Sequence, residues 1–125
     1  LDAAQSLHRD GIDVSVLDLR WLAPLDEEAL MSAAQAAGWR VVIVHEAVRT
    51  GGFGAEIVTR LVESAGDVSE LKVRRLTTPD VRIPAAPLLQ RALLPDVSRI
   101  INAVREVVEE KAGGSSARRS SEYEH

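Results

Sequence analysis

The stretch "WRVVIVHEAVRTGGFGAEIVTRLVES", residues 39–64, decides the fold of this chain. Residues 41–44 are a continuous apolar run, which is typical of a strand buried on both faces, as in a parallel sheet. The glycines Gly51, Gly52 and Gly54 then open into a segment whose apolar residues recur on one helical face. The stretch therefore predicts a strand, a tight turn and a helix, the repeating unit of an α/β domain.

The sequence before this stretch predicts two helices and one strand. Apolar residues at helical spacing begin at Leu1, and Gly11 is a natural helix stop. The alternating residues of 13–19 then predict a strand. Asp26 is a good cap for a further helix, which we expect to end at Gly38.

The sequence after residue 53 predicts a helix over 54–65, a strand over 71–77 and a long helix over 96–110. Residues 81–95 contain prolines and predict a loop with one short helical turn. Residues 112–125 have almost no apolar side chains, which predicts a flexible tail after a domain spanning 1–111.

The alternation of helices and strands predicts a three-layer α/β/α domain with a small, mostly parallel sheet. Three strands are few for such a sheet, and the chain starts at Leu1 in the middle of a helical pattern. We therefore expect a fragment of a longer polypeptide whose first strand, before Leu1, is missing.

Composition and charge exclude several function classes. The chain has 125 residues, a net charge of −4 and 3% aromatic residues, so no basic face or aromatic platform favours nucleic acid binding. It has no cysteine, and no apolar run approaches the ~20 residues of a membrane span. No signal peptide pattern is visible, which favours a cytosolic protein or one of an organelle matrix.

His45, Glu46 and the three glycines are the candidate functional stretch. They follow a predicted parallel strand, where ligands gather in open α/β sheets, and free N–H groups at a helix start can hold an anion. The alternative is a packed turn that needs glycine for its backbone conformation. The spacing matches neither a Walker loop nor a dinucleotide fingerprint. No catalytic triad and no set of metal ligands is visible.

Arg74 and Arg75 are adjacent on a predicted strand, so they face opposite sides of the sheet. One of them should point inward and need a carboxylate partner, for which Asp18 is the candidate. From the residues alone, Asp67 and Glu70 are ordinary solvated charges.

Three motifs taken together resemble a known family. They are "VLDLRWLAPLDEEAL", "VVIVHEAVRTGGFGAEI" and "VRRLTTPDVRIPAAPLLQRALLPDVSRIINAVREVV", in this order. They resemble the C-terminal domain of the β subunit of 2-oxo acid dehydrogenase E1 components, of the pyruvate or branched-chain type, within the transketolase-like group. The resemblance covers about residues 1–110.

The resemblance implies an assembly domain rather than a catalytic one. In that family, thiamine diphosphate and Mg²⁺ lie between the E1 α subunit and the N-terminal domain of the β subunit. It therefore implies that this chain has no catalytic, cofactor-binding or metal-binding residue, is inactive alone, and contributes to an enzyme that decarboxylates a 2-oxo acid and passes the acyl group to lipoyl-E2.

The partners that the resemblance implies are the E1 α subunit, a second β subunit and the subunit-binding domain of E2. Asp67 and Glu70 are the candidate docking residues for that basic domain, and the glycine turn becomes a packed turn near an interface. A fragment that lacks a strand is also expected to self-associate.

Two other readings stay open. In the first, the chain is a freestanding anion- or metabolite-binding module that uses the glycine turn 51–54. In the second, it comes from another transketolase-like enzyme, such as a deoxyxylulose phosphate synthase or a transketolase proper.

Overall fold

The computed structural model describes residues 1–110, so the predicted tail at 112–125 lies outside the described residues. The elements follow one another as helices α1 and α2, strand β1, helix α3, a 3-10 turn η1, strand β2 and helices α4 and α5. Their bounds are Asp2–Arg9 (α1), Glu27–Ala36 (α2), Arg40–Val48 (β1), Phe53–Ser64 (α3), Val68–Glu70 (η1), Lys72–Thr78 (β2), Pro87–Leu93 (α4) and Val97–Glu109 (α5).

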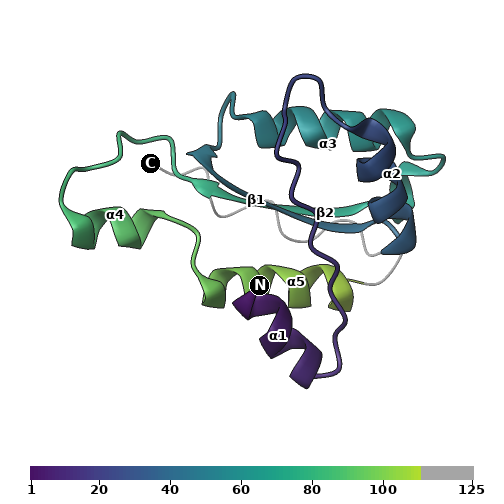
Figure 1. Ribbon diagram of the computed structural model, residues 1–125, viewed down its shortest axis with the longest axis horizontal. Helices are drawn as coiled ribbons and strands as arrows, with labels where there is room; N and C mark the ends of the chain where they lie inside the picture. Colours follow the sequence, from purple (N-terminus) through teal and green to yellow (C-terminus); the bar gives the residue numbers. More distant parts are fainter. Residues whose placement is uncertain (111–125) are drawn as a thin grey trace.

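The described residues form three layers around a two-stranded parallel sheet. β1 and β2 run side by side, with Arg40 opposite Lys72 and Val44 opposite Leu76. Helices α2 and α3 lie over one face of the sheet, α5 covers the other, and α1 packs on α5 (Figure 1). The predicted α/β/α architecture with a parallel sheet is confirmed.

The core is divided by the sheet. On the α2 and α3 side, one buried cluster joins both helices to β1; its members are Leu30, Ala34, Ile43, Ile57 and Leu61. On the other side, the buried apolar residues belong to α1 and α5; they are Ala3, Leu7, Ala103, Val104 and Val107. The small side chains of Ala3 and Ala103 suit a close approach of these two helices.

The predicted helix ends are confirmed. The Asp26 carboxylate accepts a hydrogen bond from the backbone N–H of Ala29 at 3.0 Å, which caps α2. Gly11 and Gly38 follow α1 and α2 with φ values of 81° and 59°, the left-handed region that glycine adopts without strain.

The predicted strand over 13–19 is wrong. This segment has no regular secondary structure and connects α1 on one side of the sheet with α2 on the other (Figure 1). Alternating apolar residues form a strand only where a neighbouring backbone supplies hydrogen bonds. Without such pairing, Val16 and Leu17 remain 60% and 42% exposed.

Two smaller predictions need correction. β1 is not buried on both faces, since Val44 and Val48 are 46% and 41% exposed. The proline-containing segment carries a seven-residue helix, α4, rather than a single turn. No helix within the described part of the chain is long and apolar enough to span a membrane.

Candidate functional site

The glycine turn lies where β1 ends and α3 begins. Gly51 has a φ of 72°, and a Cβ atom on Gly52 would lie 2.2 Å from the carbonyl oxygen of Val48. A Cβ on Gly54 would lie 3.5 Å from the Ile43 side chain, so α3 starts close against the sheet. Chain reversal and close packing account for these glycines. Anion binding at the turn stays a prediction.

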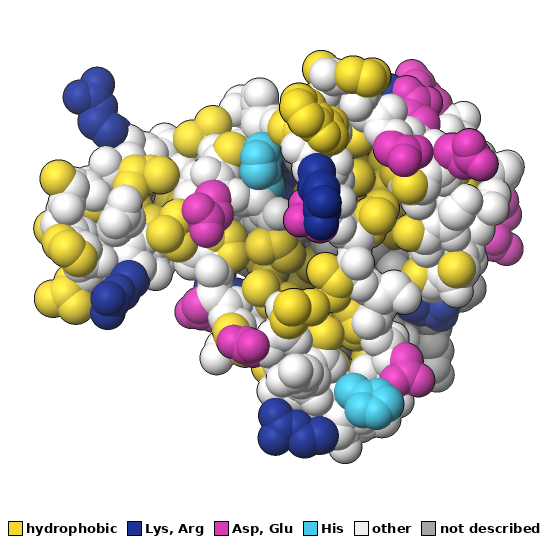
Figure 2. Space-filling view, in the orientation of Figure 1, with side chains coloured by type: hydrophobic (Ala, Val, Ile, Leu, Met, Phe, Trp, Pro, Cys, Tyr) yellow, Lys and Arg dark blue, Asp and Glu magenta, His cyan; other side chains and the backbone are white. Residues whose placement is uncertain are grey.

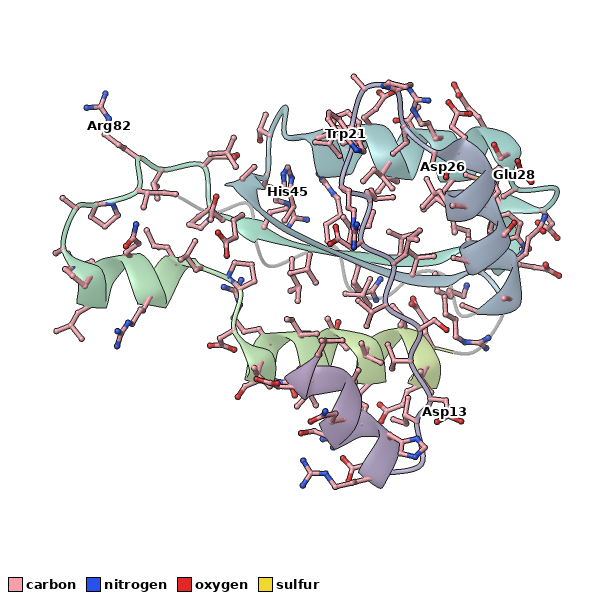
Figure 3. All side chains as sticks on the ribbon, viewed as in Figure 1. Asp13, Trp21, Asp26, Glu28, His45 and Arg82 are labelled. Carbon is pink, nitrogen blue, oxygen red and sulfur yellow. The ribbon has the colours of Figure 1, made fainter. Side chains whose placement is uncertain are left out.

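His45 and Glu46 do not form a pair. They are consecutive on β1, where the pairing with β2 is irregular, and no hydrogen bond or ion pair joins their side chains. The half-buried imidazole of His45 lies on the α3 side, whereas Glu46 is exposed (Figure 3). Nothing in this geometry makes Glu46 a partner that could orient His45 for proton transfer.

A tether joins the loops that follow the two strands. Asp80 accepts hydrogen bonds from the Thr50 backbone N–H at 2.8 Å and from the Thr50 hydroxyl. The Thr50 hydroxyl and N–H both lower the pKa of Asp80, because they stabilise its charged form. The sequence analysis missed this contact, although polar residues after both strands were the signal that could have suggested it.

The two adjacent arginines of β2 face opposite sides of the sheet, as predicted, but Asp18 is not a partner of either. Arg74 lies 3.2 Å from both Glu106 and Glu110 of the α5 end. Asp18 instead accepts from the backbone N–H of Arg20 at 3.1 Å, within the segment that was wrongly predicted as a strand.

Arg75 contacts the segment that begins the glycine turn. Its guanidinium donates to the carbonyl oxygen of Arg49 at 3.1 Å, and its Cδ would lie 3.8 Å from a Cβ on Gly54. Arg75 and the Asp80 tether therefore hold the start of this turn from two sides.

Asp67 and Glu70 lie at the other edge of the sheet. Both are exposed: Asp67 caps the start of η1 and Glu70 ends it, in the turn that leads into the amino end of β2. Asp67 accepts from the Ser69 backbone N–H at 2.8 Å, and hydrogen bonds from Ser69 lower its pKa. The structure does not bring these two carboxylates together with the glycine turn.

The sequence analysis named no partner for His8, and the structure supplies one. His8 Nδ1 lies 2.6 Å from Asp13 Oδ1 beside an open pocket of about 710 Å³ between α1, the following segment and the end of α2. The His8 and Asp13 side chains are 76% and 88% exposed, so water surrounds both. A pair this exposed lacks the enclosure that is typical of a catalytic site.

Within residues 1–110, no three side chains of the metal-binding types gather in one place. The described residues therefore present no carboxylate cage of the kind that holds a divalent cation.

The family comparison covers most of the chain. Residues 1–100 match the family described as transketolase, C-terminal domain.

Three curated relatives are β subunits. The chain is 33% identical to the pyruvate dehydrogenase E1 component subunit beta of Rhizobium meliloti, over 86% of this chain and 23% of the relative. It is 30% identical to the acetoin:2,6-dichlorophenolindophenol oxidoreductase subunit beta of Bacillus subtilis, over 90% of this chain and 32% of the relative. It is 33% identical to the 2-oxoisovalerate dehydrogenase subunit beta of the same organism, over 87% of this chain and 33% of the relative. The chain thus spans between 23% and 33% of the length of these relatives.

Proposed function

Because this chain belongs to the transketolase C-terminal domain family, we propose that it is the C-terminal assembly and docking domain of a 2-oxo acid dehydrogenase E1 β subunit. The observation that carries the proposal is the similarity to β subunits over 86% to 90% of the chain. The names of these relatives refer to pyruvate, 2-oxoisovalerate and acetoin enzymes. A domain shared among enzymes of different substrates suits a role in assembly better than one in substrate choice.

The complete enzyme would decarboxylate a 2-oxo acid with thiamine diphosphate and Mg²⁺ and transfer the acyl group to lipoyl-E2. We assign the cofactor and its chemistry to the α subunit and the N-terminal part of the β subunit. The compartment would be the bacterial cytoplasm or an organelle matrix.

Exposed apolar side chains around α4 support the assembly role. Leu88 and Leu89 are 81% and 59% exposed, and Val81 is 50% exposed in the preceding loop. Figure 2 shows hydrophobic side chains gathered over this end of the molecule. A contiguous exposed apolar patch is typical of an interface, so we assign this surface to contacts between subunits.

The assembly role is tested in the complete β subunit, expressed with its α subunit. Replacing Leu88 and Leu89 by Glu should prevent assembly of the α and β subunits, because burying two unpaired carboxylates is unfavourable. Sedimentation velocity measures the assembled fraction. Val62→Glu is the control, since Val62 is 39% exposed on α3, away from this patch. Full assembly of the Leu88/Leu89 variant would contradict the role.

The docking role is tested with the subunit-binding domain of E2. Asp67→Asn combined with Glu70→Gln should weaken its binding about tenfold, since exposed charge pairs contribute about 0.2–1 kcal/mol each. Asn at position 67 keeps an oxygen for the bond to Ser69. Glu63→Gln, at the end of α3, is the matched control, and calorimetric titration is the measurement. Equal affinity of all three proteins would move the docking site elsewhere.

A further inference from the structure

We propose that a pocket at the carboxyl edge of the sheet binds a phosphate-bearing small molecule through Arg49, Arg99 and Thr78. The pocket is an open hollow of about 380 Å³ between the ends of the two strands, the last turn of α4 and the first turn of α5. Small-molecule sites commonly have volumes of about 300–1,000 Å³. This site goes beyond the assembly and docking role and depends on different residues.

The charge of the pocket is opposite to that of the chain. The chain has a net charge of −4, yet the two charged residues that line the pocket are Arg49 and Arg99. Among residues 1–110, no carboxylate lies within 4.0 Å of either guanidinium, although Asp80 is near enough to Arg49 for the Arg49 charge to contribute to the lowered pKa of Asp80. Two such cations beside one concave surface favour an anionic ligand.

Thr78 supplies an independent indication of a ligand. This last residue of β2 is 1% exposed and lines the same pocket. Its hydroxyl oxygen is buried and has no hydrogen-bond partner among the described residues. Buried hydroxyls are nearly always hydrogen-bonded, so we infer that the Thr78 side chain turns toward the pocket on binding and meets an oxygen atom of the bound molecule.

Both arginines extend from fixed backbone. The N–H of Arg99 donates to the Asp96 side chain at 2.8 Å, and its guanidinium donates to the carbonyl oxygen of Leu94 at 3.3 Å. The carbonyl of Arg49 accepts from Arg75, and the next residue, Thr50, is held by Asp80. A site whose parts are positioned before binding loses less conformational entropy when the ligand arrives.

The number of positive charges favours phosphate over carboxylate. A phosphate monoester carries about −1.5 to −2 charges at neutral pH, which balances two guanidinium groups, whereas a carboxylate carries one. Its several oxygens can also accept from both arginines and from a hydroxyl at the same time. The pocket volume leaves room for a group attached to the phosphate.

The test is a calorimetric titration of the 125-residue chain at about 0.15 M salt with pyrophosphate, ribose 5-phosphate, adenosine 5′-monophosphate and acetate. We expect saturable binding of at least one phosphate compound at one site, and none of acetate. Arg49→Gln and Arg99→Gln should each raise its Kd about tenfold through the lost charge-assisted bonds. Thr78→Val should raise it about fivefold.

Matched variants separate specific binding from general effects. Arg82→Gln changes the charge equally, but Arg82 is exposed and points away from the molecule (Figure 3), so the Kd should not change. Thr78→Val also serves as the folding control, because removing an unpaired buried hydroxyl should leave the melting temperature equal or higher. Absence of saturable binding, binding of acetate as tight as phosphate, or unchanged binding by Arg49→Gln and Thr78→Val would each overturn the proposal. None of these results bears on subunit assembly.

Discussion

Gly52 shows how strictly a single position can be determined by its surroundings. Its φ of −72° is ordinary, so backbone conformation alone would allow any residue there. The restriction comes from distance, because a Cβ atom would lie 2.2 Å from the Val48 carbonyl oxygen. The neighbouring atom is backbone, so relief requires movement of the strand end or of the α3 start.

We therefore expect Gly52→Ala to lower the free energy of unfolding by about 2 kcal/mol or more, as strained backbone substitutions do. Urea unfolding followed by circular dichroism measures the change. Gly66→Ala is the control, since a Cβ at Gly66 would meet nothing within 4 Å. That variant should be neutral or slightly stabilising. Equal stability of the two variants would show that the turn adjusts freely.

Asp80 makes the stability of the chain depend on pH. Its pKa is lowered in the folded state by the bonds from Thr50. A lowered pKa contributes stability above the unfolded-state value, and that contribution is lost as the pH falls through the folded-state value.

Asp80→Asn should consequently be less stable than the parent at pH 7. The difference should diminish as the pH falls below about 4, where the unfolded chain begins to bind the proton, toward the lowered pKa of the folded state. Urea unfolding at pH values between 3 and 7 gives the difference directly. Thr50→Val, which removes the hydroxyl donor, should reproduce part of the same pH dependence. If the difference in stability stays constant with pH, the loss in Asp80→Asn comes from the altered shape of the side chain and not from the lost carboxylate charge.

At the scale of the element, α3 shows how one helix divides its residues between core and solvent. Leu61 is fully buried against the sheet and α2, whereas its neighbour Val62 is 39% exposed. The spacing of 3.6 residues per turn places adjacent residues about 100° apart, so the two side chains have different surroundings.

Leu61→Ala should cost about 2–5 kcal/mol through lost burial and the cavity that remains. Val62→Ala should change stability by no more than about 0.5 kcal/mol, as surface substitutions usually do. Both values come from urea unfolding at neutral pH. Similar losses for the two variants would mean that Val62 is covered in solution, for example by a second molecule.

Local sequence patterns predicted most helices and strands correctly. The helices are the clearest case, because their caps and hydrogen bonds join residues that are close in sequence. Asp26 begins α2 through a bond to Ala29, three residues away, and Gly11 follows α1 with the expected backbone conformation. The run 41–44 predicted β1 because strands buried beside helices are apolar in sequence. These relations span a few residues, so they can be read from the sequence.

The failures involve partners that are distant along the chain. Residues 13–19 alternate like a strand, but a strand requires a second backbone, and the sequence does not say whether one is adjacent. The Thr50–Asp80 tether joins residues 30 positions apart. Arg74 meets Glu106 and Glu110, which lie 32 and 36 positions away at the end of α5, and not Asp18, which was the predicted partner. Tertiary packing determines these contacts.

At the scale of the whole molecule, much apolar surface remains uncovered. Leu88 is 81% exposed, Trp21 is 74% exposed and Val16 is 60% exposed. Trp21 lies near α3 on the face shown in Figure 3, whereas α4 lies at the far end of the molecule. Exposed apolar residues at separate places favour association with other chains.

The 125-residue chain should therefore self-associate as its concentration rises, and Leu88→Glu combined with Leu89→Glu should shift it toward the monomer. Sedimentation equilibrium over a hundredfold range of concentration measures the effect.

The same chain alone should not decarboxylate a 2-oxo acid, because we assign the reacting cofactor to other parts of the enzyme. Decarboxylation by the purified chain, after adding thiamine diphosphate and Mg²⁺, would contradict that assignment.

The way α1 is attached has a consequence for how the molecule opens. α1 packs chiefly on α5, and Asp10 beside it pairs with Arg105 at 2.7 Å, whereas β1 and β2 are joined along their length and covered by helices on both faces. Local opening exposes amides without global unfolding, at a free energy set by the contacts that must break. In native-state hydrogen exchange, the amides of α1 should exchange at low urea concentrations, and those of β1 and β2 only near the global transition. α1 would then be a separate cooperative unit, which unfolds while the two strands remain folded.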